Sequence, residues 1–436
     1  MCYYVNVLSC QFPQFQFLPI RNSNFNSQNS NFKIQFRIKF WKSGCSFAAY
    51  LTSMFLRNTI SFFKIKEAAA LSFLFSSSSL MIAVWAAALP YITGKLQLSD
   101  AELGLILLLG PVGSLTGVFL STRVFAKVPV GVWLGRGNII YALLMLGEVI
   151  SPYKWVFGSL LYLRGMMGFL NGVAMNAVVG KLEDKYERRL MATCHAMYSI
   201  GGGVGAGVAA LLFSLGIVSP IQAALMAAGV IITILLLRPF YVKHDYYIHS
   251  KSRLALPGGP VLGLAFICLV LFMTEGSIVD WSSIYLSRNL ALPLVFISLG
   301  YGGFAVAMTL GRMNGDMLIP RIGQKRIVIL GTVIAALGLS LVSVSATAAV
   351  AIAGFVLTGI GCSCVVPVLF SSAGRIPGVS PVQGFGMVTS GGLIGFLAGP
   401  SVIGFISEHS NLTLGFRFVV IMLLLAALAA WRNKAL

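Results

Sequence analysis

Apolar runs of 18 or more residues recur along almost the whole chain after residue 67, separated by short polar, glycine- or proline-containing breaks. A run of this length crosses roughly 30 Å of hydrocarbon as a helix. Transmembrane β-strands fit poorly, because they need strict alternation over segments of about ten residues, and this sequence lacks that pattern. Only 10% of the 436 residues are charged, against roughly 25% in soluble domains. The sequence therefore predicts an all-α polytopic membrane protein.

The apolar runs divide into twelve predicted transmembrane helices. They cover residues 68–92, 102–122, 131–151, 154–178, 191–216, 219–239, 260–286, 293–314, 326–345, 347–371, 382–407 and 412–431. A polar linker at residues 241–259 separates residues 67–240 from residues 260–436, two segments of nearly equal length. Two equal sets of six spans suggest an internal repeat, a plan common among transporters. We therefore expect an N-terminal and a C-terminal six-helix bundle.

The distribution of basic residues predicts the orientation. Twenty-six of the 31 Lys and Arg residues lie in the chain ends, in or beside the linker, or in every second connection between spans. This positive-inside pattern places both termini and the linker in the cytoplasm. The net charge of +19 could also indicate nucleic-acid binding, but its distribution favours membrane orientation and excludes a nucleic-acid partner.

Residues 1–66 differ from the rest of the chain, since they carry eight Lys and Arg residues and no Asp or Glu. A basic, acid-free leader is typical of an organelle transit peptide. A disordered cytoplasmic tail, or upstream sequence outside the working protein, fits equally well. We expect the plasma (inner) membrane, or an organelle membrane if this segment is a transit peptide.

The stretch GRMNGDMLIPRIGQKR, residues 311–326, concentrates charge in a loop between the eighth and ninth spans. Its pattern is carried by Gly311, Arg312, Gly315, Asp316, Leu318, Arg321, Gly323 and Arg326. This pattern resembles the loop signature of the major facilitator superfamily. The resemblance implies two bundles that work by alternating access, with Asp316 and its Arg neighbours as a cytoplasmic gate held by charge-assisted bonds. A positive-inside loop in which Asp316 only adds solubility is the alternative.

The matching loop of the first half is degenerate. It keeps the bases Arg123, Lys127 and Arg136 but has no acid, and Pro129 stands where members of the family often have Gly.

The fourth span carries an arginine within its apolar run. Arg164, Gly168 and Gly172 fit R-x-x-x-G-x-x-x-G, which resembles the second signature of the superfamily. Ten helical residues place the Arg164 backbone about 15 Å into the membrane. A charge at that depth indicates a functional site by default. Asn171 and Asn176 follow on the same span. An arginine paired to backbone carbonyls and water is the structural alternative.

Acidic and histidine side chains supply the candidates for proton coupling. Glu275, in TEGSIVDWSSIYL, is the strongest candidate for a carboxyl group that gains and loses a proton, and we expect it to work with Arg164. Asp280 fits a cap or gate residue, and Glu148 is a weaker candidate. His195 has either a transport or a packing role, and the GGGVGAG that follows fits close helix packing.

The segments WAAALPYI, EGSIVDW and GFLAGPSVIGF resemble a bacterial branch of the superfamily that includes rhizopine-transporter-like and fucose-permease-like proteins. In the superfamily spans 1, 4, 7 and 10 line the central cavity. The resemblance therefore implies cavity positions for Trp85, Arg164, Asn171, Asn176, Glu275 and the Cys362–Pro367 region. Relatives often carry an Asp where this chain has Gly172, and if that Asp carries protons in them, proton coupling here must depend on another residue.

These features predict a secondary active transporter of a small polar solute, sugar-like or another organic compound, coupled to protons and working as a monomer. We expect no enzymatic activity, no cofactor and no metal site, and the seven cysteines show no metal-binding spacing. A non-transporting receptor or scaffold is one alternative, favoured by the degenerate first loop. An exporter of drugs or amphipathic cations is another.

Overall fold

The structure, a computed structural model, describes residues 62–188, 190–243, 246–247, 261–373, 376, 381–433 and 436. Within these ranges the side chains of residues 192, 316, 317, 381–383 and 385 are not described. Most of the predicted N-terminal extension and most of the predicted linker therefore lie outside the described residues.

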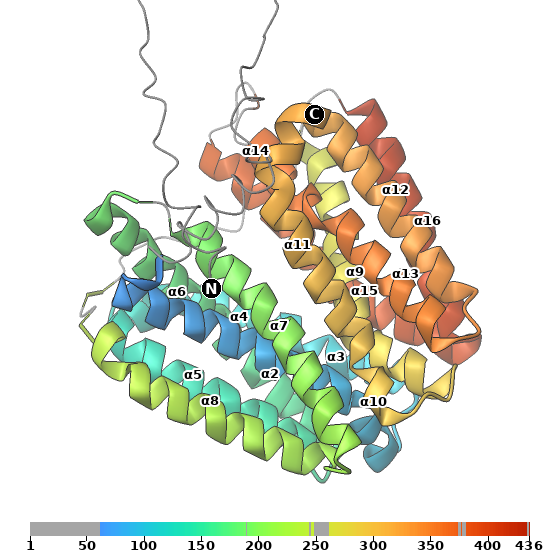
Figure 1. The fold of residues 1–436 in the computed structure, drawn as a ribbon, viewed down its shortest axis with the longest axis horizontal. Helices are drawn as coiled ribbons and strands as arrows, with labels where there is room; N and C mark the ends of the chain where they lie inside the picture. The colour runs from blue at the N-terminus through green and yellow to red at the C-terminus, as the bar shows by residue number, and fades with distance from the viewer. Residues whose placement is uncertain are drawn as a thin grey trace, which may run out of the picture. The chain divides into compact units, whose positions relative to one another are not determined.

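Helices α2 to α8 pack mainly on one another and are called the first helix group (Figure 1). They are α2 (Lys66–Leu96), α3 (Asp100–Leu107), α4 (Leu109–Phe125), α5 (Val130–Ile150), α6 (Lys154–Tyr186), α7 (Met191–Ser214) and α8 (Ser219–Tyr241). Helix α2 packs on α7 and α8, and α5 and α4 both pack on α6.

Helices α9 to α16 likewise pack mainly on one another and are called the second helix group. They are α9 (Leu262–Arg288), α10 (Leu294–Ile297), α11 (Leu299–Ile322), α12 (Gln324–Ser343), α13 (Ala348–Ser363), α14 (Val365–Ala373), α15 (Pro381–His409) and α16 (Leu412–Arg432). Helix α9 packs on α15 and α16, and α12 packs on α13 and α16.

Each predicted span corresponds to one helix or to two consecutive helices, which confirms the all-α prediction. Three spans are interrupted, at Leu108 between α3 and α4, at Ser298 between α10 and α11, and at Cys364 between α13 and α14. These three residues keep right-handed helical dihedral angles. The chain therefore continues through each interruption as a single span.

Eleven helical segments of the described residues are long and apolar enough to cross a membrane. Helix α6 has 33 residues but is not among them. Its composition explains the difference, because Arg164, Asn171 and Asn176 lie within the stretch that would otherwise be continuously apolar.

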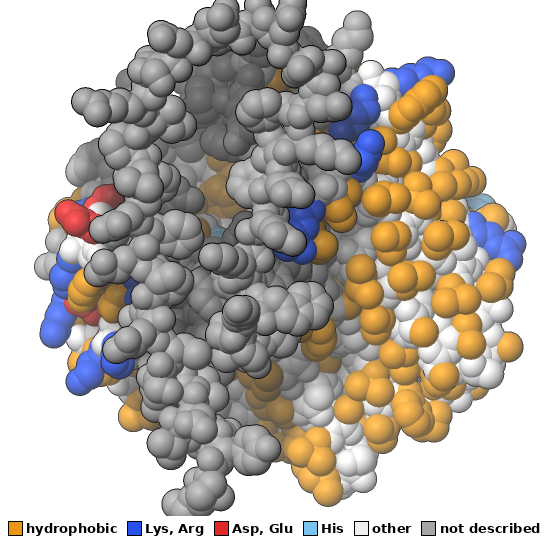
Figure 2. Space-filling model, turned by 45° about the horizontal axis from the view of Figure 1, so that its top comes forward, with side chains coloured by type: hydrophobic (Ala, Val, Ile, Leu, Met, Phe, Trp, Pro, Cys, Tyr) orange, Lys and Arg blue, Asp and Glu red, His pale blue; other side chains and the backbone are white. Residues whose placement is uncertain are grey.

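The outer surface of the helices is apolar. Hydrophobic side chains cover much of the flank of the second helix group in Figure 2, and Lys and Arg side chains lie toward its edges. Leu330 and Leu337 of α12 and Leu424 and Leu428 of α16 are among the exposed residues. An apolar surface of this extent suits hydrocarbon rather than water. Together with the eleven apolar helical segments, it identifies a multi-pass integral membrane protein.

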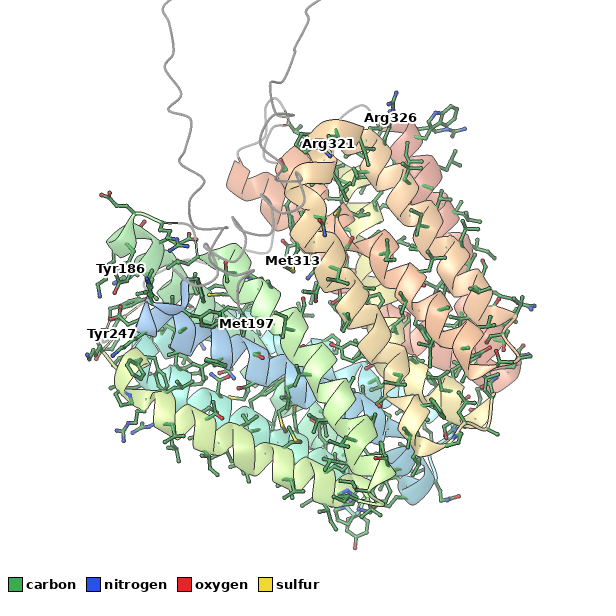
Figure 3. All side chains as sticks on the ribbon, in the orientation of Figure 1. Tyr186, Met197, Tyr247, Met313, Arg321 and Arg326 are labelled. Atoms are coloured by element: carbon green, nitrogen blue, oxygen red, sulfur yellow. The ribbon has the colours of Figure 1, made fainter. Side chains whose placement is uncertain are left out.

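The two helix groups contact each other through α3 on α15, α2 on α9 and α7 on α11. We call the end formed by residues 93–104, 286–294 and 400–412 the closed end. Here the Ser401 hydroxyl donates to the carbonyl of Gly104 at 2.9 Å. The opposite end, which carries residues 121–130, 181–188 and 312–326, is called the basic end (Figure 3).

Candidate functional site

Arg164 of α6 forms an ion pair with Glu148 of the neighbouring helix α5. Its Nε atom donates to Oε1 of Glu148 at 2.8 Å. The Glu148 side chain is fully buried, and that of Arg164 is 16% exposed. Helical side chains tilt toward the N-terminus of their own helix. In the antiparallel helices α5 and α6 the two side chains therefore extend toward each other, although their backbones lie at different depths.

Trp85 of α2 covers the guanidinium group of Arg164. The guanidinium carbon lies 4.5 Å from the ring centroid, a cation–π contact. Nε1 of Trp85 and Oε2 of Glu148 are both buried and have no hydrogen-bond partner among the described residues. The indole N–H of Trp85 and the carboxylate of Glu148 also lie within interaction range of each other.

Asp280 of α9 brings a second carboxylate from the second helix group. It lies within electrostatic range of both Arg164 and Glu148, and it forms no ion pair among the described residues. Tyr141 of α5 lies within range of Arg164 as well. We call Trp85, Tyr141, Glu148, Arg164 and Asp280 the Arg164 cluster.

Asn171 lies two helical turns beyond Arg164 in a buried polar network of the first helix group. Its Oδ1 atom accepts from Nε1 of Trp133 at 3.0 Å, and its Nδ2 atom donates to Oδ1 of Asn138 at 3.5 Å. The Ser78 hydroxyl donates to the same oxygen of Asn138 at 3.5 Å. Sequence analysis did not identify Asn138 or Trp133, although a buried amide within an apolar span is a recognisable signal.

Asn176 does not join the Arg164 cluster or the Asn171 network. It follows Asn171 by five residues, which turns it about 140° around the helix. Its side chain is exposed.

Glu275 lies on α9, half-buried, with a different guanidinium neighbour from the one that we expected. Arg312 of α11 lies within its electrostatic range. His195 of α7 also lies within range of Arg312 and packs on Phe75, with ring centroids 5.1 Å apart. The structure therefore pairs Arg164 with Glu148, and it groups Glu275 and His195 with Arg312.

The signature stretch at residues 311–326 is mainly helical, so the expectation of a loop was wrong. Helix α11 continues to Ile322, and the chain turns at Gly323, whose φ of 90° is a conformation that glycine adopts without strain. Charged residues end an apolar run, but they do not end a helix, because the backbone hydrogen bonds continue into the aqueous phase.

The glycines of this stretch allow α11 to pack closely against the residues around the α13–α14 junction. Gly311 faces Ser363, Gly315 faces Cys364, and the Cys364 thiol donates to the Gly311 carbonyl at 3.3 Å. Figure 3 places Arg321 and Arg326 at the basic end of the second group. The side chain of Asp316 lies outside the described residues, so the predicted latch stays a prediction.

Metal-binding side chains do not gather in the described part of the chain. It contains no group of three or more His, Cys, Asp or Glu residues that could hold a metal ion. Cys194, Cys268, Cys362 and Cys364 are free and buried.

Comparisons with known proteins agree with this architecture. A family model described as Major Facilitator Superfamily matches residues 262–434. An uncharacterized MFS-type transporter of Yersinia pestis is 34% identical over 359 residues, which cover 82% of this chain and 93% of the relative. The membrane protein MosC of Rhizobium meliloti is 28% identical over 370 residues, covering 83% of this chain and 88% of MosC.

The solved structure of the nucleoside transporter NupG superposes with a TM-score of 0.65. At 14% identity, over 84% of this chain and 100% of NupG, this similarity concerns the fold alone. The relative from Yersinia pestis is similar enough, over nearly its whole length, to fix the family. The chain belongs to the major facilitator superfamily of membrane transporters.

Proposed function

We propose that this chain is a proton-coupled secondary transporter of a small, hydroxyl-rich polar solute, and that it works as a monomer. The observation that carries the proposal is the buried ion pair between Arg164 and Glu148, next to Trp85 and within range of Asp280. Charged groups within membrane helices are costly and are retained mainly where they serve a function. Because Asp280 comes from the other helix group, relative movement of the groups would open and close such a site.

The hydrogen-bonding chemistry of the cluster favours a solute that both donates and accepts. Arg164 uses Nε for Glu148, and its terminal N–H groups, which lie within reach of Tyr141, can also donate to a solute. In the proposed site, Oε2 of Glu148 and the carboxylate of Asp280 would accept from the solute, and Nε1 of Trp85 would donate to it. Hydroxyl groups of a sugar or polyol match this mixture, because each hydroxyl does both.

Coupling to protons would follow from competition for Arg164. A deprotonated Glu148 holds the guanidinium, and protonation of Glu148 would release it to the solute or to Asp280. Proton and solute would then each change the affinity for the other, which is the thermodynamic requirement for coupling.

The C-terminal part of α11 and the turn into α12 are our candidate for the gate at the basic end, which we place in the cytoplasm. The gate residues are Gly311, Arg312, Gly315, Asp316, Arg321, Gly323 and Arg326. Glu275 and His195, which share Arg312 as an electrostatic neighbour, would lie between this gate and the Arg164 cluster.

Counterflow in proteoliposomes tests the proposal. The panel contains sugars, polyols, nucleosides and amphipathic cations, and protein with Arg164→Ala is compared with protein with Lys154→Ala. Lys154 forms an exposed pair with Glu102 and serves as the control. We expect saturable counterflow of hydroxyl-rich solutes that Arg164→Ala abolishes and Lys154→Ala retains. Counterflow of cations alone would favour an exporter, and no counterflow at all would favour a receptor or scaffold.

A further inference from the structure

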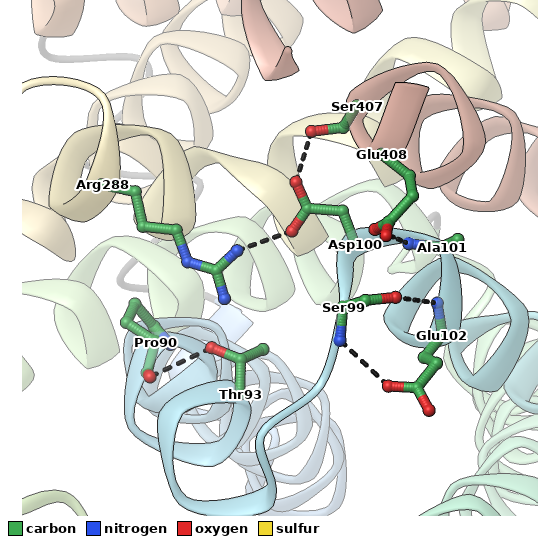
Figure 4. Close-up of polar contacts among 9 residues, drawn as sticks. All are labelled: Pro90, Thr93, Ser99, Asp100, Ala101, Glu102, Arg288, Ser407 and Glu408. Carbon is green, nitrogen blue, oxygen red and sulfur yellow. Dashed lines mark hydrogen bonds and ion pairs between the residues drawn. The ribbon is translucent and has the colours of Figure 1, made fainter. Parts of the chain in front are cut away.

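Asp100, the first residue of α3, contacts two helices of the second group at the closed end (Figure 4). Its Oδ1 atom accepts from a terminal nitrogen of Arg288 of α9 at 2.6 Å. Its other carboxylate oxygen accepts from the hydroxyl of Ser407 of α15. One carboxylate therefore joins the first helix group to two different helices of the second.

Glu408 adds a further polar contact between the same helices. Its carboxylate accepts from the backbone N–H of Ala101 at 3.2 Å. The first N–H groups of a helix lack intrahelical partners and favour a negative charge. The start of α3 is thus capped partly by a residue from the other helix group.

Next to these polar contacts, the backbones of α3 and α15 pack directly against each other. A Cβ atom built on Gly104 would lie 3.1 Å from the Cα atom of Gly404 and 3.2 Å from the carbonyl oxygen of Pro400. Further along, the Ser283 hydroxyl of α9 donates to the carbonyl of Ala86 of α2 at 2.5 Å, and Ser283 is buried. Any opening of the closed end must separate all of these groups.

We propose that Asp100, Arg288, Ser407 and Glu408 form a latch that holds the closed end shut and breaks once in each transport cycle. The inference rests on the proposed alternating-access function. The Arg288 and Asp100 side chains are 41% and 19% exposed, so the ion pair is partly hydrated and its rupture costs little. A latch of this kind raises the population of the closed state but still allows the closed end to open.

A nearby ion pair supplies a matched control. Glu102 lies two residues after Asp100 on the same helix and pairs with Lys154 at 2.6 Å. Both members of this pair belong to the first helix group, so it does not need to break when the groups separate. Removing the charge of Asp100 therefore breaks a contact between the two helix groups, whereas removing the charge of Glu102 does not.

The test measures access to the closed end in the full-length protein in membrane vesicles. Ser283→Cys is introduced into a background without the native cysteines, and its modification by a membrane-impermeant thiol reagent is followed. Asp100→Asn should raise the modification rate several-fold, and Glu102→Gln should leave it unchanged. Exchanging the charges, with Asp100→Arg and Arg288→Asp together, should restore a rate near the starting value.

Equal modification rates in Asp100→Asn and Glu102→Gln proteins would overturn the proposal. A second measurement needs no variant at Asp100, because added salt screens partly exposed charges and should itself raise the modification rate. A rate independent of salt would also count against the latch. The assay requires neither solute nor proton gradient, so a failed latch and a failed transport proposal give separate results.

Discussion

Arg164 and Glu148 are joined by a 2.8 Å contact between Nε and Oε1 across the antiparallel helices α5 and α6. Both residues belong to the first helix group, so their pairing can persist while the two groups move. Asp280, in contrast, lies on α9 of the second group, within electrostatic range of the pair. Movement of the two groups is therefore expected to change the distance from Asp280 to the pair, whereas the pair itself is expected to open only when Glu148 is protonated.

Neutralising Glu148 should uncouple transport from the proton gradient. In Glu148→Gln protein, solute accumulation driven by an imposed pH gradient should fall by about tenfold or more, equivalent to at least about 1.4 kcal/mol. Counterflow should continue at a reduced rate, since exchange needs no net proton movement. Glu275→Gln is the comparison, measured in the same proteoliposomes. Loss of accumulation in Glu275→Gln protein but not in Glu148→Gln protein would assign coupling to Glu275 instead.

Replacing Arg164 by lysine should remove most transport, although the charge is kept. Arginine donates from Nε to Glu148 while its planar guanidinium group stacks on Trp85. Lysine has a single ammonium group and cannot make both contacts. We expect counterflow to fall by about tenfold or more in Arg164→Lys protein, equivalent to about 1.4 kcal/mol. Lys154→Arg, at the exposed pair with Glu102, should remain close to the starting rate. Full activity in Arg164→Lys protein would mean that only a positive charge is required.

A bulky residue at Gly104 should prevent the closed end from closing. Gly104→Leu would force side-chain atoms against the backbone of Gly404 and Pro400, a form of overpacking that costs about 1–3 kcal/mol. We expect faster thiol modification of Ser283→Cys and slower counterflow. Gly229→Leu on α8 is the control, because a Cβ atom there meets nothing within 4 Å. Similar behaviour of the two variants would show that helix propensity, not contact between the groups, is responsible.

The orientation of the chain can be measured directly. Accessible tags at the C-terminus and within the predicted linker at residues 241–259 should report the cytoplasm, and a tag near Leu290 should report the opposite side. This expectation follows from the positions of the Lys and Arg residues. A linker tag found outside would reverse the orientation and place the closed end in the cytoplasm.

The helices could be predicted from the sequence because hydrocarbon selects for long apolar runs. The ends of helices could not, since α6 continues to Tyr186 and α11 to Ile322, well past their apolar runs. Hydropathy reports where a helix meets lipid, and a helix that leaves the membrane keeps its hydrogen bonds. The interruption at Leu108, in contrast, has a signal in the sequence, because Pro111 has no N–H to donate to the carbonyl of Leu107 four residues earlier.

The candidate site could be predicted only in part. Arg164 was identified because a charge within an apolar run is conspicuous. The sequence did not indicate Glu148 as its partner. Glu148 is close to the end of its span, whereas the Arg164 backbone is about ten residues into the following span. Sequence position gives the depth of Cα atoms, but two long side chains that tilt toward each other span the difference. Asn138 was missed because its partners, Ser78 and Asn171, come from other helices.

The polar composition of α6 also bears on how the protein is made. An arginine at the centre of a helix raises the cost of entering the bilayer by about 3 kcal/mol. Glu148 offsets this charge from α5, which is joined to α6 by only the three residues between Ile150 and Lys154. The two helices would therefore leave the translocation machinery more favourably as a paired hairpin than one after the other. On this view the ion pair first acts during biosynthesis, before any solute is carried.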